Sequence, residues 1–216
     1  MICNQRFIKG HPDTWLWKDD DDEVFSVKSA YYKLQGNFVE EEDKVFHMLW
    51  NTKVTPKAQF LGWRISLDKL PTKDNLIVRG VQLQHNLCEL CQVSAESVDH
   101  LFSSCRVAQK VWNLCDNWLG VSSVHHFKAR ENFKHFSIIN LNTRQNSIWR
   151  GMWLAIVEEI WKHRNWVIFK QRKVDPDEIF GLAQVIAWVW MKHKISSVNF
   201  SYSDWVFSPL SCLKSL

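Results

Sequence analysis

The sequence predicts a mostly α-helical protein with one small β-hairpin near its N-terminus. Three observations support this fold class. Apolar residues recur at the three- and four-residue spacing of amphipathic helices through most of the chain after residue 26. Residues that typically cap helices stand at the ends of these segments. Glycine is sparse, with 7 among 216 residues, and 46% of the residues are hydrophobic, which favours a packed core over a disordered chain.

The hairpin is expected in the segment TWLWKDDDDEVFSV, residues 14–27. Two short runs of aromatic and β-branched residues flank the acidic run Asp19–Asp22, as in two strands joined by a turn. The next segment, SVKSAYYKLQG, changes to helical spacing, with Ser26 as the expected N-cap and Gly36 as the expected stop. An acidic stretch then leads to a second helix, whose apolar positions are Val45, Phe46, Leu49 and Trp50.

A third helix is expected in TPKAQFLGWRISLDKL, residues 55–70, with Thr55 as its cap and Pro56 at its first position. Its expected common face consists of Phe60, Leu61, Arg64 and Leu67. Thr72 should cap a short fourth helix that ends at Gly80. A further amphipathic helix, ended by Gly120, is marked by Ala108, Val111, Trp112, Cys115 and Leu119.

The C-terminal half of the chain is expected to hold two longer helices. Residues 121–142 show the least regular pattern and are expected to be a linker or irregular segment. A long helix is predicted at about 145–172, and a last helix at about 176–195 follows the cap signature Asp175-Pro176. The tail NFSYSDWVFSPLSCLKSL is expected to be extended or irregular. We therefore divide the chain into residues 14–120, the segment 121–142, and a C-terminal helical region, 143–216.

Several classes of protein are excluded by composition. The first residues, MICNQRFIKGHPD, have no apolar core of a signal peptide, and charged residues interrupt the most apolar segment, so no membrane span is expected. Six cysteines in 216 residues do not make a disulfide scaffold. An intracellular location follows as the expectation, with nucleus and cytoplasm not distinguished. In a reducing compartment, clustered cysteine and histidine favour a metal site over disulfides.

Such a cluster stands in CELCQVSAESVDHLFSSC, residues 88–105. A tight turn can aim the thiolates of a C-x2-C pair at one point, and an H-x4-C pair can complete a tetrahedron. Three sulfurs and one imidazole favour zinc, and four protein ligands leave no open position, so the zinc should be structural rather than catalytic. The candidate ligands are Cys88, Cys91, His100 and Cys105. The fold class is thus an N-terminal β-hairpin, a zinc-pinned helical domain and a C-terminal helical pair.

The same segment allows alternatives to this zinc site. Buried free cysteines also behave as small hydrophobic residues, and His85 could replace His100 with a less suitable spacing. An iron–sulfur cluster suits this ligand set less well. His100 should lie on a short helix in ESVDHLFSS, with Ser104 capping the helix that follows and Cys105 in the first turn of that helix.

Several linked segments resemble a known family. From about Trp15 to Trp118, VFSVKSAYYKL, LWNTKVTPKAQFLGWRISLDKLPTKDNLIVRGV and CELCQVSAESVDHLFSSCRVAQKVW occur in the order typical of the reverse-transcriptase zinc-binding domain of plant LINE-type (non-LTR) retrotransposons. IWKHRNWVIF, residues 160–169, is similar to a segment found downstream of that domain. The resemblance implies that the four candidate ligands bind zinc and that the chain is a C-terminal fragment of a retroelement polyprotein. The chain departs from the family in having Glu89 after the first cysteine, where proline is usual.

No catalytic motif is apparent in the sequence. A polymerase centre needs an aromatic-x-Asp-Asp motif and a further upstream aspartate, because paired carboxylates hold two metal ions. The acidic run in WKDDDDEVF lies in the predicted hairpin turn and is interpreted as solvated. A ribonuclease H set of carboxylates, a Ser/His/Asp arrangement, a P-loop and a dinucleotide fingerprint are all missing from the sequence. We therefore expect no enzyme activity and no small-molecule substrate.

A basic segment makes RNA or DNA a candidate partner. Residues 51–216 carry 21 basic and 13 acidic side chains, and WKHRNWVIFKQRK, residues 161–173, interleaves cations with aromatic residues. Cations can contact phosphates while an aromatic ring stacks on an unpaired base. The candidate contacts are Lys162, Arg164, Lys170, Arg172, Lys173, Arg106 and Lys110. A second basic set near the cysteine cluster adds Lys57, Arg64, Lys69, Lys73 and Arg79, although Arg64 could instead form a buried ion pair.

Two other functions stay open. The aromatic residues of the basic segment could line the core while its cations form a solvated face. The chain would then be a structural or interaction module that docks on a reverse-transcriptase core. A zinc hydrolase would need an open coordination position and a general base, which the closed ligand set does not provide.

Overall fold

The computed structural model describes residues 17, 24–27, 29, 30, 39–123 and 125–216, and most of the predicted hairpin lies outside these residues. The chain divides into two units, Met1–Asp43 and Lys44–Leu216. In the first unit, the backbone N–H of Ser29 donates to Ser26 Oγ over 3.0 Å, and the N–H of Ala30 donates to the Ser26 carbonyl over 3.0 Å. The predicted N-cap at Ser26 is therefore confirmed, while the predicted stop at Gly36 lies outside the described residues.

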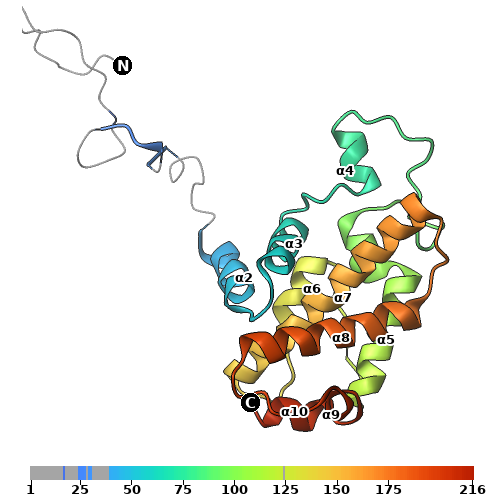
Figure 1. Cartoon of the computed structure of the whole chain (residues 1–216). Helices are drawn as coiled ribbons and strands as arrows, with labels where there is room; N and C mark the ends of the chain where they lie inside the picture. Colours follow the sequence, from blue (N-terminus) through green and yellow to red (C-terminus); the bar gives the residue numbers. More distant parts are fainter. Residues whose placement is uncertain (1–16, 18–23, 28, 31–38, 124) are drawn as a thin grey trace, which may run out of the picture. The chain divides into compact units, whose positions relative to one another are not determined.

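Helices make up the described part of the second unit, which confirms the prediction of a mostly α-helical protein (Figure 1). No β-strand occurs among the described residues, where strand pairing is limited to one bridge between Leu87 and Ala95. The elements are α2 (Val39–Asn51), α3 (Pro56–Ser66), α4 (Lys73–Val78), η1 (His100–Ser104), α5 (Arg106–Leu119), α6 (Ala129–His135), α7 (Thr143–Lys170), α8 (Pro176–Lys194), α9 (Tyr202–Phe207) and α10 (Pro209–Lys214). None of the described helices is long and apolar enough to cross a membrane.

The long helix α7 lies at the centre of the second unit. It starts with a capping box in which Asn142 and Gln145 satisfy each other's backbone N–H groups. All residues from 151 to 160 are buried, so this part of α7 has protein on every side. Helices α8, α3 and α10 pack against it (Figure 1). The predicted bounds of this helix and of α8 agree with the structure to within a few residues, and Asp175 caps α8 as expected.

Helix α3 buries a different face from the expected one. Thr55 caps it as predicted, but its buried residues are Ala58, Gly62 and Ile65, whereas Phe60 is 52% exposed. The physical reason is close approach: a Cβ atom on Gly62 would lie 2.7 Å from the side chains of both Leu154 and Leu49. The approach therefore requires a residue without a side chain at position 62, and Phe60 is left toward the surface.

Two segments expected to be irregular contain helices. Residues 121–142 include α6, and Asn132 Oδ1 accepts a hydrogen bond of 2.9 Å from Trp153 Nε1, which ties this segment to α7. The expectation of an extended tail was wrong, because α9 and α10 occupy it. Ser201 forms a capping box with Asp204 at the start of α9. Trp205 is buried, and its Nε1 atom donates to the Gln184 carbonyl over 3.1 Å.

Candidate metal centre

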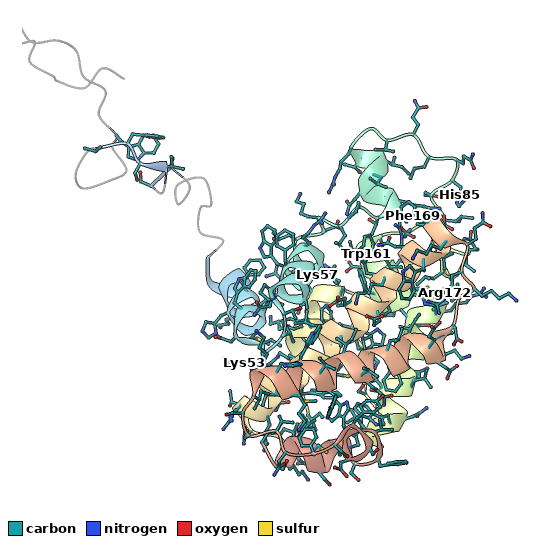
Figure 2. All side chains as sticks on the ribbon, in the orientation of Figure 1. Lys53, Lys57, His85, Trp161, Phe169 and Arg172 are labelled. Carbon is teal, nitrogen blue, oxygen red and sulfur yellow. The ribbon has the colours of Figure 1, made fainter. Side chains whose placement is uncertain are left out.

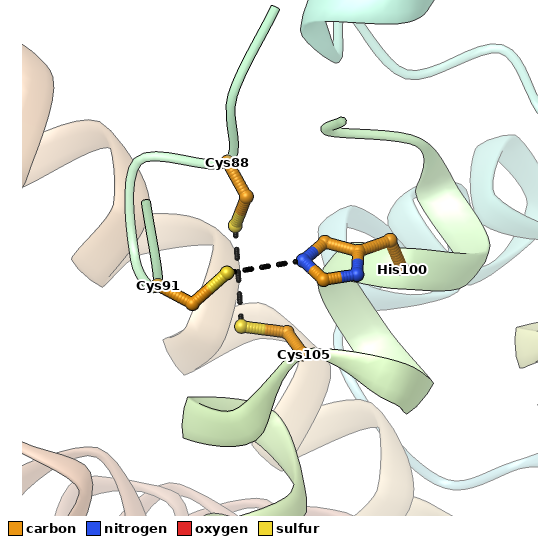
Figure 3. A group of neighbouring side chains, drawn as sticks. All are labelled: Cys88, Cys91, His100 and Cys105. Atoms are coloured by element: carbon orange, nitrogen blue, oxygen red, sulfur yellow. Dashed lines mark hydrogen bonds between the residues drawn. The ribbon is translucent and has the colours of Figure 1, made fainter. Parts of the chain in front are cut away.

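A short loop, residues 86–96, which we call the metal loop, carries the first pair of ligands, Cys88 and Cys91. The backbone N–H of Cys88 donates to the Ser94 carbonyl over 2.8 Å, and the N–H of Glu96 donates to the Asn86 carbonyl over 2.9 Å. At the tip, Gln92 adopts a φ of 56° and its N–H donates to the Cys88 carbonyl over 2.8 Å. This left-handed turn bends the chain sharply, so the thiols of Cys88 and Cys91 point to the same side of the loop (Figure 3).

The second pair lies at the junction of η1 and α5. The predicted helix carrying His100 is confirmed, and it has the wide turn of a π-helix, in which the Cys105 N–H donates to the His100 carbonyl over 2.7 Å. The expected cap at Ser104 was wrong, because Cys105 itself is the N-cap of α5. Ser104 Oγ instead lies 3.3 Å from His100 Nδ1. An Nδ1–H bond to Ser104 leaves Nε2 free to bind a metal ion.

The four side chains converge on one point (Figure 3). Cys88 Sγ lies 3.9 Å from Cys105 Sγ, and Cys91 Sγ lies 3.3 Å from His100 Nε2. All four ligand atoms lie within 4.8 Å of one another. Ligands at 2.0–2.3 Å from a tetrahedral zinc ion would be roughly 3.3–3.8 Å apart. Because the donor atoms, their number and their spacing agree with zinc, these residues can hold a structural Cys3His zinc ion.

The local electrostatics shift the pKa values of the ligands in different directions. The pKa of Cys105 is lowered by its hydrogen bond with Cys88 and by the backbone amides of Ala108 and Val107, although burial opposes this. The hydrogen bond with Cys105 and burial raise the pKa of Cys88. Burial lowers the pKa of His100, which favours the neutral imidazole. A zinc ion requires deprotonated thiolates and a neutral histidine, so its binding would release protons here.

The other candidate metal ligands lie elsewhere. His85 Nδ1 lies 3.1 Å from Lys73 Nζ and is not part of the ligand group. Cys115 and Cys212 are buried away from it, and Cys3 lies outside the described residues. Within the described ranges, no second group of three or more such side chains has its ligand atoms close enough to share an ion.

Glu96, which the sequence analysis did not single out, connects the metal loop to α7. Its carboxylate is fully buried and accepts hydrogen bonds of 3.2 Å from the backbone N–H groups of Lys73 and Glu89. It also accepts from the guanidinium of Arg164, at 2.5 Å from Nη2 and 3.2 Å from Nε. No local motif marks this residue, because Arg164 lies 68 positions further along the chain.

The predicted nucleic-acid contacts have different environments. Arg164 is 5% exposed and paired with Glu96, so its guanidinium cannot reach a phosphate, and it has a structural role instead. Lys162 forms ion pairs of 2.8 Å with Glu158 and 2.7 Å with Glu159. Arg172 pairs with Glu178 and lies 4.8 Å from the centre of the Trp166 ring. The remaining candidates are exposed, namely Lys170, Lys173, Arg106 and Lys110.

The aromatic residues of the same segment are divided between core and surface. Trp161 and Trp166 are half-buried, and Phe169 is 77% exposed. Figure 2 shows Trp161 and Phe169 on α7, and Arg172 just beyond its end. The segment therefore has neither a fully buried aromatic face nor a fully free cationic face.

The fold and the closed Cys3His group define a helical zinc-binding domain, and zinc is its cofactor. Residues 25–112 match the family model described as zinc-binding in reverse transcriptase, so this segment is similar to the zinc-binding domains of that family. Such a domain is an accessory domain and not the catalytic core. The four ligands all lie within the matched residues.

A curated protein of Arabidopsis thaliana, named "Putative ribonuclease H protein At1g65750", is 26% identical to the chain over 107 residues. The matched part is 49% of this chain and 17% of that protein, so the chain spans only a small part of its relative. No solved structure matches the chain.

Proposed function

We propose that the chain is a zinc-stabilised accessory module of the reverse transcriptase of a plant LINE-type, non-LTR retrotransposon. It is a C-terminal fragment of the polyprotein, has no polymerase centre or enzyme activity of its own, and works inside the cell. It binds single-stranded RNA or DNA without sequence preference. The zinc ion supplies a structural cross-link between the metal loop and the start of α5. The family match and the closed ligand group support this proposal.

The observation that carries the proposal is the buried bridge between Glu96 and Arg164. Glu96 belongs to the metal loop, and Arg164 belongs to the part of α7 that leads into the basic segment. Folding of the metal loop therefore fixes the end of α7 in place. An ordered basic surface loses less conformational entropy on binding than a flexible one.

The surface that α7 presents at this end suits a nucleic-acid strand. Lys170 and Lys173 are exposed and have no ion-pair partner among the described residues. Phe169 is exposed beside them. Lysine side chains near phosphates release counterions, and an exposed aromatic ring can stack on any base, so this combination favours binding without sequence preference. Arg106 and Lys110, exposed on the first turns of α5, extend the proposed contact set.

A second candidate function is docking on the polymerase core of the same element. The end of α4 and the segment after it expose Ile77, Val78, Val81 and Leu83. Clustered apolar residues on a surface typically mark a protein interface. In this alternative the zinc ion holds the interface in shape, and the chain does not bind nucleic acid.

Binding of a fluorescent single-stranded RNA or DNA 20-mer at two salt concentrations tests the proposal. The double variant Lys170→Gln/Lys173→Gln should bind more weakly, and its salt slope should fall by about 1.4, since each contact to a single strand contributes roughly 0.7. The matched control, Lys194→Gln/Lys214→Gln, removes the same charge from exposed positions on α8 and α10 and should change neither. Metal content confirms that each variant holds zinc.

Two outcomes would contradict the proposal. If the 20-mer does not bind the unmodified chain at low salt, nucleic-acid binding is excluded and the docking alternative is favoured. If both double variants lose the same affinity and salt slope, binding does not involve the end of α7.

A further inference from the structure

A pocket of about 260 Å³ lies between α3 and α7, away from the zinc ligands. We call it the α3–α7 pocket. Its main lining residues are Lys57, Phe60, Arg64, Glu158, Trp161 and Lys162. Lys57 and Trp161 are visible on the two helices in Figure 2. The volume is slightly below the roughly 300–1,000 Å³ of pockets that hold drug-sized ligands, so the pocket suits a smaller group.

Aromatic rings on both helices border the pocket. Phe60 is half-exposed, because α3 approaches α7 through the face that holds Gly62, and its ring lies 5.3 Å from that of Trp63. Trp161 is half-buried, and the guanidinium of Arg164 lies 5.0 Å from the centre of its ring. Since Glu96 fixes Arg164, the indole is held in place from one side. Exposed rings in a fixed orientation suit stacking on a planar group.

The rim of the pocket is positively charged. Lys57 is exposed and has no ion-pair partner among the described residues. Arg64 donates to the backbone carbonyl of Lys69 over 2.9 Å rather than to a carboxylate, so its charge is not neutralised by an acid. Two uncompensated cations beside aromatic rings favour a ligand that carries both phosphates and a flat ring.

Glu158, which lines the pocket, carries a buried oxygen that lacks a donor. Glu158 is 7% exposed, and its Oε1 atom accepts from Lys162 over 2.8 Å. Its Oε2 atom is buried and has no hydrogen-bond partner. Because buried polar atoms are normally paired, this oxygen favours an N–H donor, which a ligand supplies once the Glu158 side chain turns its Oε2 atom toward the pocket.

We propose that the α3–α7 pocket binds one unpaired base of single-stranded RNA or DNA. The base stacks on Phe60 and Trp161, and the flanking phosphates contact Lys57 and Arg64. The Glu158 side chain turns its Oε2 atom toward the pocket, where this oxygen accepts from the exocyclic amino group of the base. This inference rests on the proposed function and makes it more specific. Adenine, cytosine and guanine offer an amino group, whereas uracil and thymine offer one N–H between two carbonyl oxygens that repel a carboxylate. The pocket therefore selects amino-bearing bases.

The test measures anisotropy of labelled 10-mers of rA, rC, rU, dA and dT with the zinc-loaded chain. Adenine and cytosine strands should bind several-fold more tightly than uracil and thymine strands. Glu158→Gln should remove this preference, because the glutamine amide can both donate and accept. Phe60→Ala should weaken the binding of every strand by about 5- to 160-fold, as expected for the loss of one stacked base. Phe207→Ala, which removes an exposed ring from α9, away from the pocket, is the matched control.

The outcomes separate this inference from the function on which it rests. Absence of binding to every 10-mer would overturn both. Binding that depends on Lys170 and Lys173, with no effect of Phe60→Ala beyond that of Phe207→Ala, would overturn the pocket alone. An unchanged base preference in Glu158→Gln would also overturn it. If Glu158→Gln does not fold, Phe60→Ala and Lys57→Gln still test whether the α3–α7 pocket binds the strand. Both residues are on the surface, so both variants should fold.

Discussion

The buried bridge between Glu96 and Arg164 gives the sharpest prediction for stability. Glu96→Gln keeps the shape of the side chain and removes its charge, which leaves the guanidinium of Arg164 buried without a counter-ion. Arg164 is 5% exposed and Glu96 is 0% exposed, so water cannot replace the lost partner. Breaking a buried ion pair by removing one partner costs about 3–5 kcal/mol. For a protein of this size, that loss corresponds to a decrease in Tm of about 6–20 °C.

Urea unfolding followed by tryptophan fluorescence, with zinc in excess, measures the change. Arg164→Met should also lose stability, because Glu96 is then buried without its cation. The double variant Glu96→Gln/Arg164→Met should lose less than the sum of the two single changes, since neither partner is then left charged and unpaired. The loss of stability in the double variant minus the sum of the two single losses is the coupling energy of the pair.

A surface carboxylate supplies the control for this experiment. Glu131 lies 3.9 Å from Lys134 on α6, in a partly exposed pair. Glu131→Gln should change the free energy of unfolding by about 0–1 kcal/mol. The bridge does not hold the metal loop to α7 if Glu96→Gln lowers the free energy of unfolding by no more than Glu131→Gln does. Additive losses of stability for Glu96→Gln and Arg164→Met would refute the reasoning as well.

Three further predictions concern the metal, the packing and the pH dependence. Chelation of zinc, or Cys88→Ser, should unfold the region around residues 85–118, since structural zinc contributes on the order of 10–16 kcal/mol; unchanged circular dichroism and melting would contradict this. Gly62→Ala should destabilise by about 1–3 kcal/mol in urea unfolding, because its Cβ would lie 2.7 Å from two side chains, whereas Gly181→Ala has open space and should not. Burial raises the pKa of Glu159, so the folded state binds its proton more tightly and the wild type loses stability as pH rises through that pKa. Glu159→Gln lacks this loss, so its stability relative to the wild type should improve between pH 4.5 and pH 7.5; a constant difference in urea unfolding would contradict the assignment.

The features predicted best are those that neighbouring residues determine. Thr55 and Asp175 cap α3 and α8, because a capping side chain bonds to backbone N–H groups two or three positions ahead. The zinc ligands also lie within 18 residues, and a tight turn and a short helix are enough to bring them together. The capping box of Ser201 and Asp204 is equally local, and the sequence analysis missed it by treating the tail as irregular.

Which side chains are buried depended on contacts between distant segments. The apolar pattern of α3 predicted Phe60 on the inner face, but the approach of α7 at Gly62 admits only small residues there, so Phe60 faces solvent. Helical spacing defines a stripe on a helix and does not specify which neighbour packs against it or how closely.

By itself, the sequence determined the helical class, most helix starts and a ligand set typical of structural zinc, since these depend on bonds between residues close in the chain. The tertiary structure alone decided the roles of the charged residues. Arg164 looked like any other cation of its segment, and only the folded chain brings Glu96 to it across 68 positions. A buried charge must find an opposite charge, and a partner that distant in sequence is set by packing and not by spacing.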